Sequence, residues 1–439
     1  MVKQILILLL IFVPSLRAQD FFDDDSEGTT PGKNLTYELN GFSRGVFFGG
    51  KIVDKDEGEL KAGYGELGLK LRARKSSFGD GFAEIRFRRG SEFGSPISDF
   101  NIREAYVNTY LGNLDVRLGQ QIVVWGRADG FNPTNNITPQ NMIARSPDED
   151  DRKEGNFLLR SFYHLAPLRF EFIWVPQYVS SVLPTGLFPF PDYVRMGDTV
   201  LPDANFKNSS LALKIDAALG SFDGSFSWFK GFMPMPGIFL SNLEISDTGS
   251  LVAVVKPRPF EMNVFGADFS TTIGSFGLRG EFAYRKPIED HKLEDNLFIP
   301  NPDFQYVLGV DKSKDDFSII LQYIGRYVSE FEEFEDTGST LEELEAKNRM
   351  IASQQDEMSH AVFMRPTLAL FHETMDLELM GYYNITTEES ILRPSFAYDL
   401  ADALTLRIGA EWYSGPDNTL FGNIDEALSS VFVELKASF

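Results

Sequence analysis

Residues 431–439 read Val-Phe-Val-Glu-Leu-Lys-Ala-Ser-Phe. Side chains alternate along this stretch, because Glu434, Lys436 and Ser438 are polar while the positions between them are apolar. A period of two residues predicts a β-strand with one apolar face and one polar face. The apolar face carries Val431, Val433, Leu435, Ala437 and Phe439.

The same alternation recurs along the whole chain. Leu67, Leu69 and Leu71 oppose charged neighbours in one segment, and Phe317, Ile319, Leu321 and Tyr323 repeat the pattern much later. Short turns are predicted at about 75–80, 112–113, 166–167, 219–221, 273–275, 312–314, 372–373 and 400–402. Longer connections are predicted at about 50–59, 90–99, 127–155, 176–206, 231–258, 287–302, 329–358, 386–389 and 414–428.

Turns and longer connections strictly alternate, as in outer-membrane barrels with short periplasmic turns and long extracellular loops. Eight turns and nine connections join about 18 strands, or 16–20 if strands merge or split. The stretch 250–257 is placed inside a connection, because an extra strand there breaks the even count. The sequence therefore predicts an all-β protein, a closed antiparallel transmembrane β-barrel at residues 35–439.

Tryptophan positions agree with this topology. Trp174, Trp228 and Trp412 fall near the outer ends of strands on the apolar face, as an interfacial aromatic girdle requires. Trp125 has the opposite parity, so it turns inward or follows a bulge.

Composition narrows the class of protein. The chain has no cysteine, so it has neither disulfides nor thiolate metal sites. After residue 18 no apolar run reaches the length of a transmembrane helix. The net charge of −23 argues against nucleic-acid binding, and acidic runs such as 148–151 are assigned to loops.

The N-terminal residues have the features of an export signal. Lys3 precedes the apolar run 5–13, which is too short to cross a bilayer, and Pro14 to Ala18 supplies a breaker and a small residue. We expect a signal peptide at residues 1–18 with cleavage after Ala18. Residues 19–34 are then a short acidic periplasmic segment, too short for the plug of a TonB-dependent transporter.

The segment Arg117-Leu-Gly-Gln-Gln-Ile-Val-Val-Trp-Gly126 resembles a hairpin of porin-like barrels in Gram-negative bacteria. It is similar to a poorly characterised exported family with an R-L-G-x-Q-x-x-x-W-G strand and an Asn-Pro loop. This resemblance implies a channel-like outer-membrane protein. The following loop would lie at the pore mouth and offer polar groups to solute, although its glycines and Asn-Pro could equally serve only to shape the backbone. The candidate residues are Trp125, Arg127, Asp129, Asn132, Asn135 and Asn136.

Phe439 resembles the C-terminal sorting signal of outer-membrane barrels, which implies recognition by the barrel assembly machinery. Basic side chains share the polar face of neighbouring early strands, and we expect them to line the lumen as a basic wall. The wall guides anionic solutes or is simply a solvated surface. Its members are Lys70, Arg72, Arg74, Arg86, Arg88 and Arg117.

Enzymatic and metal-binding patterns are weak. The four histidines form no H-x-x-x-H or H-E-x-x-H pair, and no D-x-D-x-D-G spacing is present. We expect no cofactor, no metal and no catalytic residue. The enzymatic alternative is a hydrolase with a lipid-facing Ser/His site assembled from distant strands. Residues 340–343 form a capping box and predict a helix to about Met358, either exposed outside or dipping into the lumen.

The sequence thus predicts an outer-membrane, porin-like channel for passive diffusion of small polar or anionic solutes. The alternative is a surface-exposed barrel that binds an envelope polymer or a partner protein through its loops. Expected partners are outer-membrane lipid and lipopolysaccharide, the assembly machinery and a small solute. A homotrimer is compatible with the sequence, which does not decide between monomer and trimer.

Overall fold

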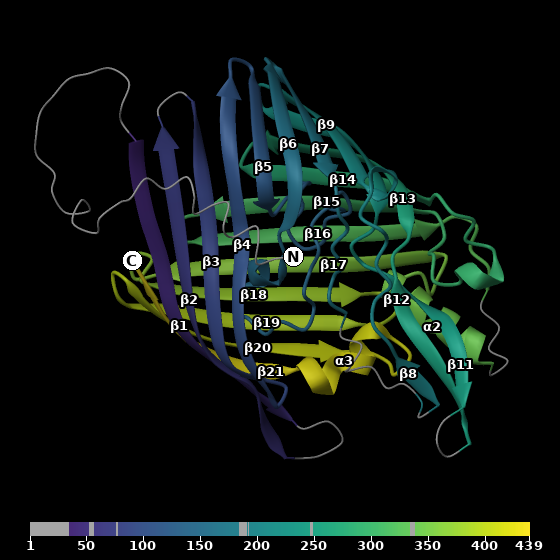
Figure 1. Ribbon diagram of the computed structural model, residues 1–439. Coiled ribbons are helices and arrows are strands. Elements are labelled where there is room, and N and C mark those ends of the chain that lie inside the picture. Colours follow the sequence, from purple (N-terminus) through teal and green to yellow (C-terminus); the bar gives the residue numbers. More distant parts are fainter. Residues whose placement is uncertain are drawn as a thin grey trace, which may run out of the picture.

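The computed structural model describes residues 35–51, 57–75, 78–183, 191, 193–245, 249–333 and 339–439. Eighteen strands form one antiparallel sheet that closes when β1 (Leu35–Lys51) pairs with β21 (Ser430–Ser438). The predicted closed barrel of 18 strands is confirmed (Figure 1). The proposed signal peptide, 1–18, and the acidic segment, 19–34, lie outside the described residues.

Each barrel strand pairs with the next one along the chain, so the sheet is a simple meander. The strands between β1 and β21 are β2 (Gly58–Lys75), β3 (Gly79–Glu92), β4 (Ser95–Leu111), β5 (Leu114–Gln121), β6 (Asn156–Leu165), β7 (Leu168–Val175), β9 (Ser210–Leu219), β10 (Phe222–Phe232), β13 (Glu261–Ile273), β14 (Phe276–Pro287), β15 (Asp303–Lys314), β16 (Phe317–Val328), β17 (Met358–Leu370), β18 (Met375–Asn384), β19 (Ser390–Ala401) and β20 (Leu404–Ser414).

Alternation along each strand sets which side chains face out. Leu67, Leu69 and Leu71 of β2 are 38–45 % exposed on the outer wall, while Glu66, which precedes them, is buried. An apolar outer wall and a charged inner wall are what a barrel in a bilayer requires. Among the described residues, no helix is long and apolar enough to cross a membrane.

The predicted turns lie where the structure has its short connections, with one shift; residues 76–77 of the first turn lie outside the described residues. The turn predicted at 312–314 lies at 315–316, because β15 continues to Lys314. One predicted loop is wrong: β3 and β4 extend to Glu92 and Ser95, and only Phe93 and Gly94 join them. Both residues have positive φ, 47° and 73°, which suits a two-residue hairpin turn.

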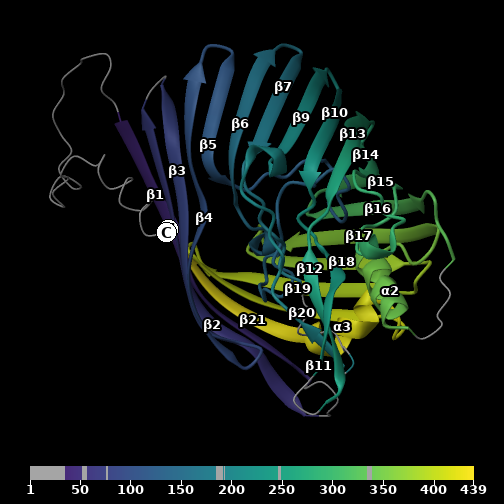
Figure 2. The same ribbon diagram turned by 45° about the vertical axis from the view of Figure 1, so that its right-hand side comes forward.

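The long connections carry their own secondary structure at the end of the barrel opposite the C-terminus (Figures 1 and 2). A three-stranded sheet comprises β8 (Val194–Met196), β11 (Gly237–Ile245) and β12 (Leu251–Arg258). Residues 250–257, placed in a connection from the sequence, are therefore largely a strand, but one outside the barrel. Helix α3 (Leu420–Leu428) was not predicted; its apolar Ile424 and Leu428 are buried.

Helix α2 (Thr340–Ala352) confirms the predicted helix, with an earlier end and a different cap. Its capping box joins Ser339 and Glu342 rather than residues 340 and 343. Leu344 packs with Ile238 and Val255 of the small sheet, and Met350 packs in the cluster that holds α3. The helix is thus covered on one side by the other outer connections.

The tryptophan side chains lie on the side of the barrel wall that their parity predicts. Trp412 is 48 % exposed on the outer wall, whereas Trp125 is 3 % exposed and points inward. Its Nε1 donates to Glu171 Oε1 at 3.2 Å.

Phe439 lies at the seam of the barrel. Its backbone N donates to Gly41 O at 3.0 Å, and Gly41 N donates to Phe439 O at 2.9 Å. The ring is 60 % exposed on the outer side. The last residue therefore completes the pairing that closes β1 on β21.

A candidate solute passage inside the barrel

Strand β5 is only eight residues long, whereas its neighbour β4 has 17. The chain leaves the wall at Gln121 and returns at Asn156. Residues 122–155, here called the lumen segment, run inside the barrel and contact its wall on several sides. A segment folded into the lumen narrows any passage through it.

The first part of the lumen segment packs against an apolar wall. Val123, Trp125 and Ile137 are at most 3 % exposed and belong to one cluster with Leu158 and Ile173 of β6 and β7. Burial of these side chains stabilises the segment by roughly 1.5–3 kcal/mol each. The hydrophobic contact fixes one side of the segment against the barrel.

The next residues reach the barrel half that bears the short turns. Arg127 Nε donates to Asp268 Oδ1 at 2.6 Å, and Arg279 Nη1 donates to Asp129 Oδ2 at 3.0 Å. Glu281 accepts from the backbone N–H groups of Arg127 and Ala128. Arg127 and Arg279 line a cavity of about 400 Å³.

The Asn-Pro residues fold tightly on themselves. Asn136 is 5 % exposed and its Nδ2 donates to Pro133 O at 3.0 Å. Asn135 N donates to Asn132 O at 3.2 Å, and its side-chain Oδ1 is buried. Of the six loop candidates, Arg127 lines the cavity, Asp129 pairs with the lining residue Arg279, and Asn136 serves the backbone turn. The segment goes deeper than the pore mouth expected from sequence.

The last part of the lumen segment is held by charge. Asp151 is 9 % exposed and accepts from Arg44 Nη2 at 2.7 Å and from Arg86 Nη1 at 2.6 Å. Glu149 accepts from Arg365 Nη2 at 2.9 Å and from Arg393 Nη1 at 3.0 Å. The acidic run 148–151, assigned to a loop on sequence, thus lies inside the barrel between β1, β3, β17 and β19.

A third anchor joins the segment to the strands near the seam. Arg145 is 1 % exposed, and its Nη2 donates to Glu411 Oε2 at 2.6 Å and to Leu428 O at 3.0 Å. Arg152 lies 3.4 Å from the other oxygen of Glu411. Because these pairs are buried, losing one partner leaves an uncompensated charge, which is strongly destabilising.

The six basic-wall residues share the inner face of β2, β3 and β5, in two groups. Arg86 and Arg88 are paired: both contact Glu66, at 3.5 and 3.4 Å. Lys70 lies 3.7 Å from Glu84. Arg72, Arg74 and Arg117 make no ion pair among the described residues.

Arg72 and Arg117 instead flank two aromatic rings. The Arg72 guanidinium lies 5.5 Å from the centre of the Phe82 ring, and that of Arg117 lies 4.3 Å from the Tyr106 ring. The two rings are 5.4 Å apart. Both arginines are half-buried, so this stack presents positive charge to the lumen in the short-turn half of the barrel.

The residues that hold the lumen segment were not among the candidates from sequence: Arg44, Glu66, Arg145, Glu149, Asp151 and Glu411. Their pairing joins positions as far apart as 107 and 266 residues. Inward parity on β1, β2 and β20 marks the wall residues, but nothing local marks Asp151 as their partner. Among the described residues, no group of three or more histidine or acidic side chains is placed to hold a metal ion.

The acid stability of the Asp151 anchor follows from its surroundings. Burial acts to raise the pKa of Asp151, but Arg44, Arg86 and the Ser146 hydroxyl together hold it well below its usual range. A lowered pKa contributes stability that is present above the ordinary value, about 3.9, and is lost as pH falls through the folded value. We therefore expect trypsin cleavage within the lumen segment to stay slow between pH 7 and about pH 5. Faster cleavage at pH 5 would contradict this anchor.

The chain is similar in fold to several solved structures of outer-membrane barrels. The chain matches OccAB1 of Acinetobacter baumannii with a TM-score of 0.53 and 9 % identity, covering 92 % of this chain and 96 % of that one. OccAB4 of the same species gives 0.53 and 9 %, over 93 % and 98 %. The fold is that of porin-like outer-membrane barrels. OccK10 of Pseudomonas aeruginosa gives 0.51 and 10 %, over 92 % and 98 %.

A family model described as a protein of unknown function, DUF1302, matches residues 17–154. This range includes the first strands, the R-L-G-x-Q-x-x-x-W-G hairpin and most of the lumen segment. A search of curated proteins gave no match. The comparisons therefore support the fold and leave the solute open.

Proposed function

We propose that the protein is a passive outer-membrane channel for small polar or anionic solutes. The observation that carries this proposal is the lumen segment, which crosses the inside of an 18-stranded barrel and is held there by ion pairs, of which those of Asp151 and Arg145 are buried. Barrels of 16–18 strands leave room for an aqueous channel, and an internal segment sets its narrowest part. We expect no enzymatic activity.

The preference for anions rests on Arg72 and Arg117. Both face the lumen, neither makes an ion pair in the described structure, and each is stacked on a ring that fixes its position. The net charge of the chain is −23, but the field of the acidic connections outside the barrel is screened within roughly 10 Å at 0.1 M salt. The unpaired wall cations therefore act more strongly on a solute in the lumen.

Replacing Arg72 and Arg117 together with Gln is expected to shift the reversal potential toward cation preference, because two lumen charges disappear without breaking an ion pair of the described structure. The Gln side chain keeps an N–H donor for Asn108 Oδ1, which accepts from Arg117 Nε at 2.6 Å. Planar-bilayer recording in a salt gradient measures this shift. Arg195→Gln is the matched control, since Arg195 is 60 % exposed in its side chain and pairs with Glu244 at the outer end. An equal shift in the control, or none in the double variant, would contradict the proposal.

Arg86 and Arg88 are unsuitable for that test. Glu66 is 4 % exposed and contacts both of them, so their removal leaves a buried carboxylate with fewer partners. Neutralising Glu149 is equally unsuitable as a loop control, because it frees Arg365 and Arg393 inside the barrel.

Assembly partners follow from the proposed location. We propose that the barrel assembly machinery inserts the chain and that lipid and lipopolysaccharide surround it. Homotrimer formation remains an expectation; cross-linking in intact outer membranes distinguishes a trimer from a monomer.

A second candidate function is binding of an envelope polymer or partner at the outer end. Helix α2 and the connections at 386–388 and 416–419 enclose a pocket of ≈ 820 Å³ with polar lining residues such as Gln355, Thr387 and Asn423. A barrel that binds there without passing solute would leave liposome swelling at the background rate.

A further inference from the structure

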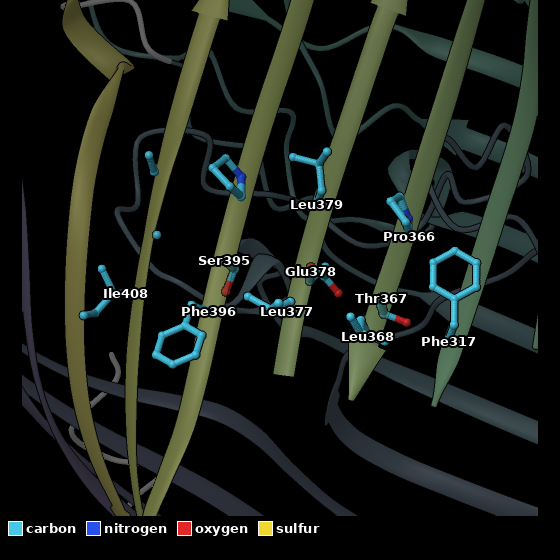
Figure 3. Close-up of a pocket in the computed structure, with 13 residues that line it drawn as sticks. Phe317, Pro366, Thr367, Leu368, Leu377, Glu378, Leu379, Ser395, Phe396 and Ile408 are labelled. Atoms are coloured by element: carbon cyan, nitrogen blue, oxygen red, sulfur yellow. The ribbon is translucent and has the colours of Figure 1, made fainter. Parts of the chain in front are cut away.

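The outer wall has a groove across β16 to β20, with a volume of ≈ 470 Å³. Its lower rim is one cross-strand row, in which Phe317 pairs with Leu368, Leu368 with Leu377, Leu377 with Phe396, and Phe396 with Ile408. Figure 3 shows these side chains along the rim on adjacent strands. The groove is therefore built from lipid-facing positions.

Two prolines lower the floor of the groove relative to its rim. The next row contains Pro366, Leu379, Pro394 and Ala410, so small rings and a methyl group replace large side chains. The strand pairing is interrupted at both prolines. It passes from Met364–Gly381 to Thr367–Glu378 between β17 and β18, and from Leu392–Trp412 to Ser395–Gly409 between β19 and β20. A proline cannot donate to the ladder, which explains both gaps.

Positive charge stands where the floor row begins. On β15, Lys312 pairs with Ile319 of the floor row and Lys314 pairs with Phe317 of the rim. Both lysines have the lipid-facing parity of Leu308 and Val310. Neither makes an ion pair in the described structure, although the turn that follows contains Asp315 and Asp316. Lys312 Nζ lies 4.3 Å from the centre of the Phe276 ring, which holds it on the outer wall.

The direction of the groove fits one leaflet. Five strand spacings of about 4.8 Å separate β15 from β20, or about 24 Å. Strands tilted by about 45° incline the row equally, so it rises about 17 Å, close to half of the roughly 30 Å hydrocarbon core. Lys312 lies three residues before the turn at 315, and Ala410 lies seven residues after the turn at 403. The row therefore begins near the short-turn end of the barrel at β15 and moves away from that end toward β20.

We propose that this groove binds one phospholipid of the periplasmic leaflet, with its phosphate at Lys312 and Lys314 and one acyl chain along the floor. The lysines supply charge complementarity at headgroup depth, and the rim and floor supply continuous apolar contact. This inference rests on the proposed outer-membrane location, with the short turns on the periplasmic side.

The groove lies on the other side of the barrel wall from two arginines that hold the lumen segment. Arg365 and Arg393, which bind Glu149 inside the barrel, immediately precede the two prolines that face the lipid. In both Arg-Pro dipeptides the arginine therefore binds Glu149 inside the barrel, while the proline lines the groove on the outer wall.

Native mass spectrometry of the full-length protein, extracted from outer membranes in mild detergent, tests the proposal. We expect the wild type to retain one phospholipid. Lys312→Glu with Lys314→Glu is expected to lower retention at least about tenfold, from lost attraction to phosphate. Pro366→Phe with Pro394→Phe fills the floor independently and is compatible with folding, because phenylalanine is a good strand residue that restores the missing donors.

Matched controls separate this site from general lipid contact. Lys286→Glu changes a lipid-facing lysine at the opposite end of β14, and Leu308→Phe enlarges the wall outside the groove; both are expected to retain lipid as the wild type does. Equal retention in all variants, or a retained adduct with the mass of lipopolysaccharide, would overturn the proposal. Bilayer conductance is read separately, so failure of lipid binding leaves the channel function intact.

Discussion

Asp151→Asn is expected to raise single-channel conductance and to expose the lumen segment to trypsin. The substitution removes the negative charge from ion pairs with Arg44, which is 4 % exposed, and Arg86. Breaking a buried pair costs about 3 kcal/mol, which shifts the ratio of docked to released segment by about a hundredfold. The barrel pairing itself is untouched, because Asp151 belongs to no strand.

Asp150→Asn is the matched control for this variant. The Asp150 side chain is 70 % exposed and, within the described part of the chain, forms an ion pair with Lys153 alone. Its loss is therefore expected to change the free energy of docking of the segment by less than about 1 kcal/mol. Planar-bilayer conductance and the rate of trypsin cleavage at Arg152 or Lys153 provide two independent measurements. Wild-type values for Asp151→Asn in both would show that the segment does not depend on this anchor.

Deletion of Phe439, or Phe439→Asp, is expected to reduce the heat-modifiable barrel in outer-membrane fractions to a small part of the wild-type amount. The residue makes the last two backbone hydrogen bonds with Gly41 and presents its ring on the outer side of the seam. A charged or missing terminal residue weakens closure and removes the aromatic group that we expect the assembly machinery to recognise.

Phe371→Asp is the control for exposed aromatic surface. Phe371 is 71 % exposed in the short turn between β17 and β18, so it matches Phe439 in exposure and in the end of the barrel it occupies. Its yield is expected to match the wild type, and Phe439→Tyr is expected to retain most of the yield. Loss in both aspartate variants would attribute the effect to charge at the periplasmic rim.

The barrel could be predicted because its determinants are local. Within each strand, the alternation of apolar and polar residues shows which side chains share a face. Turns such as Gly112–Asn113 lie between two such alternating segments. The predicted loop at 90–99 failed for a local reason as well: Gly90, Ser91, Ser95 and Pro96 resemble loop residues, yet they pair across a tight turn.

The interior could be predicted only in part. Parity placed the six basic-wall residues on the inner face, but their paired or unpaired state depends on Glu66, Glu84 and Asp151, which reach them through the fold. The acidic run 148–151 was assigned to a solvated loop because charge alone favours water. Its arginine partners lie on strands up to 244 residues away, a relation that no sequence pattern expresses.

Liposome swelling with neutral sugars of increasing size tests most directly whether this barrel is a channel. We predict that the wild type admits a pentose well above the rate of liposomes containing heat-denatured protein, and that entry slows sharply for a trisaccharide because the lumen segment narrows the passage. Swelling at the denatured-protein rate for every sugar would contradict a channel function.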